Sequence, residues 1–204
     1  MTSVITGDII NSRKSKPLHW LTMLKEELNQ IGKSPKVWEI YRGDSFQVEV
    51  TDIHETLKWA FKIKSAIKQT KNLDVRMGIG IGTKAPGSTK ITEANGEAFT
   101  HSGMAFEALK KRTLIVKSPW QDFDEEINLL LQAILLTADQ WTPNSAEMVN
   151  LSIALNKAIQ SELAKKLNIT QGRVSERQKR AGLEELLKID IRYRQLIDKK
   201  INHT

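Results

Sequence analysis

The order of predicted strands and helices in the first 117 residues most constrains the fold of this chain. Residues 2–6 form a β-branched run, and residues 37–41 and 45–50 alternate in polarity on either side of a Gly-Asp turn signal. An amphipathic helical pattern at residues 17–31 separates the first strand from the other two. A second, at residues 53–69, separates those two from a glycine-rich strand that follows. The predicted order is therefore β-α-β-β-α-β.

This order is that of the ferredoxin-like split βαβ arrangement, an antiparallel sheet with its helices on one face. A helix at about residues 97–110 and a last strand at residues 112–117 extend it. Glycines alternate along the fourth strand, at Gly78, Gly80 and Gly82, so one face of that strand is bare. A helix or a ligand could approach the backbone closely there.

Beyond the last strand the pattern is helical throughout, and the charge changes at the same point. The net charge is +7 over residues 1–118, −6 over residues 119–156 and +6 over residues 157–204. An acidic block between two basic ones suggests a boundary near Ser118. We therefore expect an α+β protein, with a ferredoxin-like, nucleotide cyclase-like antiparallel sheet domain over residues 1–118 and an all-α helix-turn-helix domain over residues 119–204.

The composition excludes several kinds of chemistry. The chain has no cysteine, so it has no disulfide, thiolate metal site or cysteine nucleophile. No signal peptide pattern opens the chain, and no apolar run approaches the ~18 residues of a membrane span. We therefore expect a cytoplasmic protein with no membrane partner. The net charge of +7 favours polyanionic partners such as nucleic acid or nucleotides.

The most specific local pattern lies between about Asn156 and Leu187 and is typical of a helix-turn-helix module. Ala164 supplies the small residue that two helices need where they cross, and Thr170 can cap the second helix. Four apolar residues have the spacing for contacts on both sides of the turn: Leu163, Leu167, Ile169 and Val174. The pattern predicts a module that binds double-stranded DNA.

The second helix of this module would contact DNA through donors for phosphates and for base edges in a major groove. The predicted DNA-binding residues are Thr170, Gln171, Arg173, Ser175, Arg177, Lys179 and Arg180. Arg177 stands where a second apolar residue is common. Either the helix is slightly rotated, or the Arg177 stem packs while its charged head stays in water. An ordinary pair of basic helices that binds nothing is the alternative.

Two carboxylates at strand ends form a second candidate site. Asp8 follows the first strand, Asp44 lies at the hairpin tip, and these two elements are neighbours in a split βαβ sheet. Paired oxygen ligands can hold Mg²⁺ through the phosphates of a nucleotide. We predict that Asp8 and Asp44 are metal ligands. We also predict that the phosphates contact the backbone amides of Ile9 to Arg13 and the side chains of Arg13 and Lys14. Turn chemistry alone also favours Asp at such positions.

Four short segments carry a likeness to known families. They are Thr6-Gly7-Asp8-Ile9, Arg42-Gly43-Asp44-Ser45-Phe46, Arg76-Met77-Gly78-Ile79-Gly80-Ile81-Gly82 and Gly96-Glu97-Ala98-Phe99. In this order and spacing they resemble class III nucleotide cyclases and their diguanylate-cyclase relatives. The resemblance implies that both aspartates bind metals and that the hairpin, with Gly43, lies beside a nucleotide's triphosphate. With its C-terminal module, the whole chain resembles the bacterial SatD family.

The chain departs from the cyclases at two positions. Cyclases carry an Asn and, four residues on, an Arg that stabilise the transition state, and this chain has Thr100 and Met104 there. Losing preorganised donors at a developing charge costs orders of magnitude in rate. We therefore expect a site that binds a nucleotide, with Mg²⁺ as its cofactor, without cyclising it.

These patterns favour a transcriptional regulator that binds double-stranded DNA as a homodimer, with recognition helices ~34 Å apart. Its N-terminal domain would sense a nucleotide or mediate dimerisation. The first alternative is a Mg²⁺-dependent enzyme that cyclises or hydrolyses nucleoside triphosphates. The second is a protein-interaction module, in which the C-terminal helices bind a protein partner instead of DNA.

Overall fold

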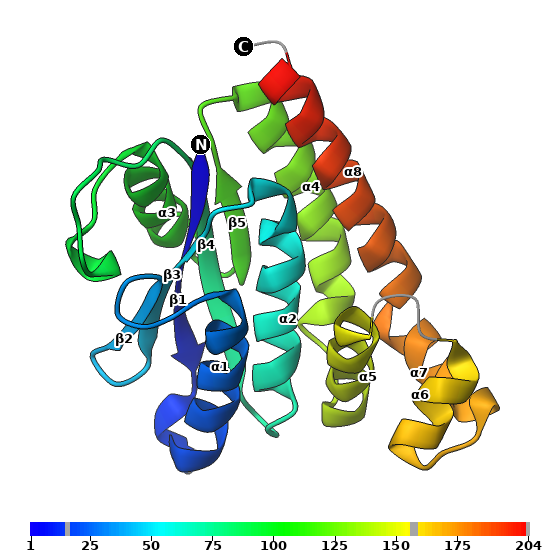
Figure 1. The fold of residues 1–204 in the computed structure, drawn as a ribbon. Helices are drawn as coiled ribbons and strands as arrows, with labels where there is room; N and C mark the ends of the chain where they lie inside the picture. The colour runs from blue at the N-terminus through cyan, green and yellow to red at the C-terminus, as the bar shows by residue number, and fades with distance from the viewer. Residues whose placement is uncertain (15–16, 156–158, 203–204) are drawn as a thin grey trace.

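A computed structural model describes residues 1–14, 17–155 and 159–202 (Figure 1). Asn156, where the predicted helix-turn-helix pattern begins, lies outside these residues. The strands are β1 (Thr2–Ile10), β2 (Trp38–Tyr41), β3 (Ser45–Val50), β4 (Asp74–Gly82) and β5 (Leu114–Lys117). The helices are α1 (Pro17–Ile31), α2 (Thr56–Lys68), α3 (Glu97–Glu107), α4 (Gln121–Ala138), α5 (Pro143–Ala154), α6 (Gln160–Leu167), α7 (Gln171–Ala181) and α8 (Leu183–Asn202), with short 3-10 turns η1 (Ser12–Lys14), η2 (Ile53–Glu55) and η3 (Ile91–Glu93).

The five strands form one mixed sheet in the order β2-β3-β1-β4-β5. The pairs β2–β3, β3–β1 and β1–β4 are antiparallel, as expected, but β5 joins β4 in parallel. The expectation of a wholly antiparallel sheet is therefore wrong at this edge. Parallel neighbours need a crossover connection, and α3 supplies it between β4 and β5.

Helices cover both faces of the sheet. Apolar residues of α1 and α2 share one buried core with Ile5, Val48 and Ile79 of the sheet. On the opposite face α3 lies directly on the bare side of β4, since a Cβ atom added to Gly80 would be 2.1 Å from the Ala98 carbonyl oxygen. The close approach that the glycine alternation predicted is thus made by a helix.

The C-terminal helices add a further layer outside α2 (Figure 1). Phe123 of α4 and Tyr193 of α8 belong to the same buried core as the sheet residues. The Tyr193 hydroxyl donates to the Ile53 carbonyl oxygen at 2.8 Å, and burial raises the pKa of Tyr193. Residues on the two sides of the predicted boundary at residue 118 therefore share one core.

A buried ionic network also joins the two parts of the chain. The Lys64 ammonium of α2 has no exposed surface and lies 2.8 Å from a carboxylate oxygen of Asp74 and 2.8 Å from one of Asp139. Lys68 pairs with the second oxygen of Asp74 at 3.0 Å. Because buried charges are costly unless they are paired, this network fixes the C-terminal end of α4 against α2 and β4.

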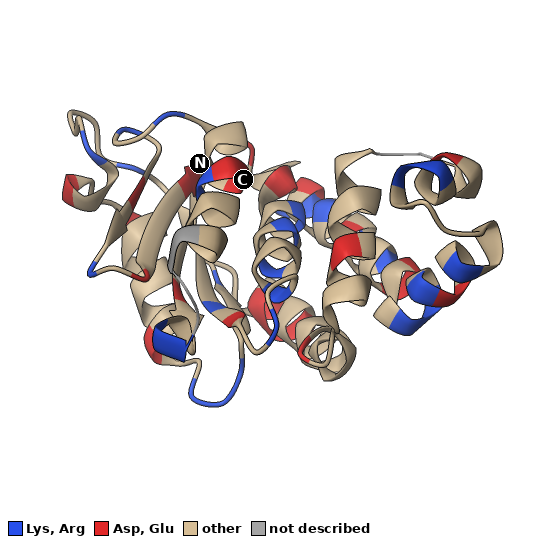
Figure 2. Ribbon diagram, turned by 90° about the horizontal axis from the view of Figure 1, so that it is seen from below, with Lys and Arg blue, Asp and Glu red and all other residues tan. Residues whose placement is uncertain are grey.

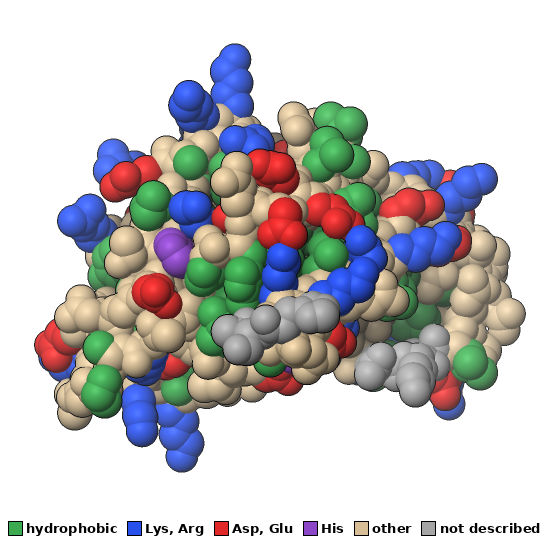
Figure 3. Space-filling view, turned by 90° about the horizontal axis from the view of Figure 1, so that it is seen from above, with side chains coloured by type: hydrophobic (Ala, Val, Ile, Leu, Met, Phe, Trp, Pro, Cys, Tyr) green, Lys and Arg blue, Asp and Glu red, His purple; other side chains and the backbone are tan. Residues whose placement is uncertain are grey.

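The surface near the C-terminal end of α8 mixes charges of both signs. Figure 3 shows acidic side chains beside basic ones over the middle of this face. Arg192 pairs with Glu126 at 2.7 Å, and Lys200 pairs with Asp122, so α8 neutralises part of the acidic start of α4. No helix within the described ranges combines the length and the apolarity needed to cross a membrane.

Candidate functional site

The α6–α7 pair consists of two short helices separated by a three-residue turn. Asn168 ends α6 in the left-handed region, with φ 52° and ψ 46°, which Asn tolerates better than most residues. The Ile169 amide donates to the Ala164 carbonyl oxygen at 3.0 Å. Thr170 then caps α7, because its hydroxyl accepts the Arg173 amide at 3.3 Å. These local bonds change the chain direction between the two helices.

A small core of its own holds this pair against α5. Met148 of α5, Leu163 and Ala164 of α6, and Val174 of α7 are buried together. Leu151, Leu167 and Ile169 pack against them and are partly buried. The residues whose spacing predicted contacts around the turn therefore do make those contacts, and α5 supplies the third side.

The outward face of α7 is polar and basic. Five of the predicted contact residues are exposed there: Gln171, Arg173, Ser175, Lys179 and Arg180. Exposed Lys165 and Lys166 add positive charge on the neighbouring helix α6; the sequence prediction did not include them, although both lie in the segment between Asn156 and Leu187. Figure 2 shows these basic segments at the end of the molecule farthest from the sheet.

Arg177 lies differently from the other basic residues of α7. Its side chain is only 21% exposed, and its Nη1 atom lies 3.3 Å from a carboxylate oxygen of Glu147 on α5. The side chain is therefore largely buried where an apolar residue is common, but its charged head is paired with Glu147, which differs from the expectation that the head stays in water. Arg177 fixes α7 on α5 instead of extending outward.

The structure brings Asp8 together with Arg76, a partner that the sequence analysis missed. The two residues are opposite each other on β1 and β4. Two parallel hydrogen bonds join them, from Nε to Oδ1 at 2.6 Å and from Nη2 to Oδ2 at 2.7 Å. The hydrogen bond to Asp8 raises the pKa of Arg76. The guanidinium also lies 5.2 Å from the centroid of the Phe106 ring on α3.

Asp44 lies beside this pair, in the loop between β2 and β3. Arg42 and Gly43 before it have φ of +53° and +91°, which turn the hairpin tightly. The Asp44 carboxylate accepts a hydrogen bond from the Ser12 hydroxyl at 2.6 Å, and its charge also raises the pKa of Arg76. The predicted convergence of Asp8 and Asp44 is thus present, with the Arg76 cation near both.

The predicted phosphate contacts differ in their availability. The Ile9 amide already donates to the Asp44 carbonyl oxygen at 3.1 Å, and the Ile9 side chain is buried. Arg13 and Lys14 are exposed on η1. Gly43 has open space where a Cβ atom would lie. Arg13, Lys14 and Gly43 therefore remain accessible to a ligand, whereas Ile9 serves the fold.

The carboxylates do not fit a Mg²⁺ site in this arrangement. Arg76 occupies both oxygens of Asp8, and Ser12 donates to Asp44. Within the described residues, no group of three or more His, Cys, Asp or Glu side chains is placed to hold a metal ion.

The two positions that differ from the cyclases lie on α3. The Thr100 hydroxyl donates to the Gly96 carbonyl oxygen of its own helix at 3.3 Å, and the Met104 side chain is 48% exposed. Neither side chain offers a charged donor. His101, one residue on from Thr100, is occupied by a bond of 2.7 Å between its Nδ1 atom and the Ile81 carbonyl oxygen.

Comparison with known proteins gives one match. No curated protein and no solved structure is similar enough to this chain to be matched. The family model described as the SatD family matches residues 3–201, which is nearly the whole chain. The chain therefore belongs to the SatD family.

Proposed function

We propose that this protein is a DNA-binding regulator of transcription and that α7 is the helix that enters the major groove. The observation that carries the proposal is the pairing of α6 and α7 around Ala164, with the polar face of α7 directed outward. Helix-turn-helix proteins place the second helix of such a pair against base edges. The basic surface on α6 and α7 supplies the electrostatic attraction to phosphates.

The residues of α7 divide into three roles in this proposal. Gln171, Arg173 and Ser175, near the N-terminal end of α7, contact base edges. Lys179 and Arg180, together with the lysines of α6, contact phosphates. Thr170 caps the helix, and Arg177 holds it against α5. The last two act by positioning the helix.

The proposal includes a homodimer. A two-fold dimer presents two recognition helices to half-sites one DNA turn apart. The outer face of α4 supports such an interface, because Leu129 and Leu136, seven residues apart, are 68% and 79% exposed. A two-residue variant, Leu129→Glu with Leu136→Glu, should be monomeric in light scattering at a concentration where the parent is dimeric. If the variant is still dimeric, the dimer interface lies elsewhere on the molecule.

For the N-terminal part we propose a cyclase-like domain that does not cyclise nucleotides. Its strand order β2-β3-β1-β4, with α1 and α2 on one face, is the order of the split βαβ arrangement. Anionic phosphates would meet Arg13 and Lys14 beside Gly43. The double pairing of Asp8 with Arg76 argues against the competing function, a Mg²⁺-dependent enzyme acting on nucleoside triphosphates.

An activity assay separates these two functions. We expect no product from any of the four nucleoside triphosphates with Mg²⁺ or Mn²⁺. Turnover that Asp44→Ala abolishes would favour the enzyme instead.

DNA binding is tested by selecting a site from random duplexes and measuring its affinity by fluorescence anisotropy over a range of salt concentrations. Arg173→Ala should cost about 1–3 kcal/mol and relax the preference at one base position. Lys179→Ala should weaken binding to all DNA sequences equally. It should also reduce the slope of log affinity against log salt concentration by about one. Arg112→Ala, which removes an exposed charge before β5, is the matched control and should bind like the parent. Failure to enrich any sequence would contradict the proposal.

A further inference from the structure

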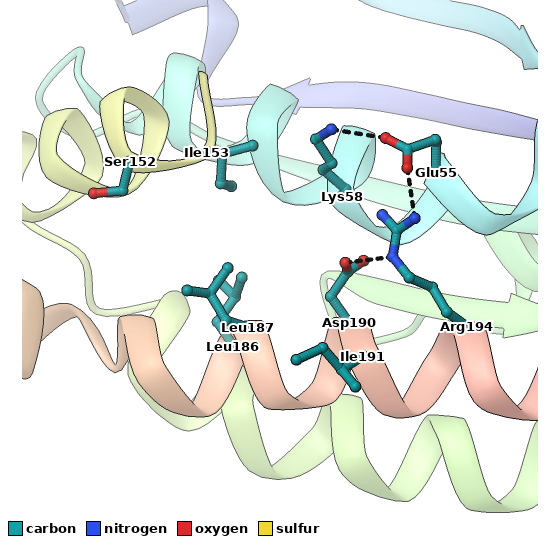
Figure 4. Close-up of a pocket in the computed structure, with 9 residues that line it drawn as sticks. All are labelled: Glu55, Lys58, Ser152, Ile153, Leu186, Leu187, Asp190, Ile191 and Arg194. Carbon is teal, nitrogen blue, oxygen red and sulfur yellow. Dashed lines mark hydrogen bonds and ion pairs between the residues drawn. The ribbon is translucent and has the colours of Figure 1, made fainter. Parts of the chain in front are cut away.

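A cavity of about 340 Å³ lies where α2, α5 and α8 meet (Figure 4). Its volume is within the range of pockets that bind small molecules. It is separate from α7 and from the Asp8–Arg76 pair, since none of those residues lines it. A ligand in this cavity would therefore bind independently of DNA and of a nucleotide.

One end of the cavity is apolar. Ile153 of α5 and Leu186 of α8 are buried, and Leu187 and Ile191 of α8 keep 44% and 55% of their surface exposed. Figure 4 shows Leu186 and Leu187 of α8 directed toward Ile153 of α5, with Ile191 farther along α8. A ligand with an apolar body would remove this surface from water, which is favourable in proportion to the area that is buried.

The other end is polar, and its cations are already paired. Arg194 lies between Glu55 and Asp190, donating from Nη1 to Glu55 and from Nε to Oδ2 of Asp190 at 2.8 Å. Lys58 pairs with the second oxygen of Glu55 at 2.7 Å. Both carboxylate oxygens of Glu55 and both cations of the cavity therefore have partners inside the protein.

Two acceptors remain without a partner. Among the described residues, the Oδ1 atom of Asp190 and the Oγ atom of Ser152 are buried and make no hydrogen bond. Burial raises the pKa of Asp190, which is the expected effect on a carboxylate that lacks sufficient compensation. A buried acceptor without a donor costs free energy, so the Asp190 atom favours a ligand that brings one.

We propose that this cavity binds a small organic cation, an amine attached to an apolar body. The amine would donate to Oδ1 of Asp190, and the apolar body would lie between Ile153, Leu187 and Ile191. An anionic ligand fits poorly, because Glu55 and Asp190 would repel it and because Lys58 and Arg194 already have partners. A neutral ligand without a donor would leave Oδ1 of Asp190 without a hydrogen bond.

Tryptamine, 3-ethylindole and indole-3-propionate are suitable probes, because they share an apolar ring and differ in charge. Ligand-observed NMR or calorimetry on the full chain should show that tryptamine binds about tenfold or more tightly than either analogue, since hydrogen bonds to a charged group are strong. Equal binding of the three probes, tighter binding of the anion or no binding of tryptamine would overturn the proposal.

Two variants test whether tryptamine binds in this cavity. Asp190→Asn should weaken tryptamine binding about tenfold or more, whereas Asp198→Asn removes the same charge from α8 outside the cavity and should not change it. Unchanged binding to Asp190→Asn would refute the proposed contact. If that variant fails to fold, Leu187→Trp fills the cavity from an exposed position and must abolish binding while the circular dichroism spectrum stays unchanged.

Discussion

The two candidate sites differ in how many of their charged residues are paired within the fold. At the Asp8 end of the sheet, each charge with a predicted metal-binding role has a partner within the fold: Asp8 with Arg76, and Asp44 with Ser12. On α7, Arg177 and Arg180 pair with Glu147 and Glu176, but Arg173 and Lys179 are exposed. A charged side chain that is already satisfied contributes to structure first, whereas exposed donors on one helix face remain available to a partner. The comparison favours DNA over a metal-bound nucleotide as the principal ligand.

The two regions also differ in what holds them together. The sheet lies in a core that extends from α1 to α8 and includes Ala181 at the end of α7, whereas α6 and the rest of α7 depend on four buried residues around Val174. Stability in proteins is not uniform, and small packing units open at lower free energy than the main core. The α6–α7 pair should therefore be the part of the molecule that opens most easily.

The largest effect is expected where α3 lies on β4. Gly80→Ala adds a Cβ atom 2.1 Å from two backbone atoms of α3, so the helix must move, and we expect a loss of more than about 3 kcal/mol in the free energy of unfolding. Gly103→Ala, in α3 with open space around it, should instead stabilise by up to about 1 kcal/mol. Urea denaturation measures both. Equal stability of the two variants would mean that α3 does not contact the sheet as described.

The second prediction concerns the small core. Leu163→Ala removes a side chain that is 1% exposed, and such substitutions cost about 2–5 kcal/mol. Because the α6–α7 core is separate from the main one, hydrogen exchange should accelerate in α6 and α7 while the amides of β4 stay protected. Ile201→Ala, at an exposed position near the end of α8, is the control and should change neither region. Faster exchange in β4 would show that the two cores unfold together.

Local periodicity was enough to predict most helices and strands, including the β2–β3 hairpin and both helices around Thr170. It could not predict the face that α3 covers or the parallel pairing of β5, because neither depends on the local pattern. It also ended β1 too early. Gly7 and Asp8 look like a turn in isolation, yet they pair with β3 and β4, and the strand continues to Ile10.

In the candidate sites, too, the local pattern could not predict which residues become partners. Strand order alone was sufficient to place Asp8 near Asp44. The partner of Asp8 is 68 positions away, and that of Arg177 is 30 positions away on another helix. Such partners depend on register and helix packing, which a single sequence does not specify. For Arg177, the sign of this pairing in the sequence was a basic residue at a position where an apolar residue is common.

A third prediction compares two arginines of α7. Arg173→Ala removes an exposed donor and should lower the affinity for a selected DNA site by about 1–3 kcal/mol. Arg177→Ala breaks a partly exposed ion pair with Glu147, which contributes roughly 0–1 kcal/mol, and should affect affinity less. Glu147→Ala should then resemble Arg177→Ala. If Arg177→Ala has the larger effect and Glu147→Ala has none, Arg177 contacts DNA directly.

The smallest effect is expected at the Asp8–Arg76 pair. Both side chains keep solvent contact, 21% and 42%, so screening limits the pair, although its two-bond geometry is favourable. A double-mutant cycle with Asp8→Asn and Arg76→Met should give a coupling free energy of about 1 kcal/mol by urea denaturation. The cycle also tests the metal site. If Asp8 pairs with Arg76, added Mg²⁺ should leave the stability of the parent unchanged. If Asp8 binds Mg²⁺ instead, the ion should stabilise the parent and lose that effect in Asp8→Asn.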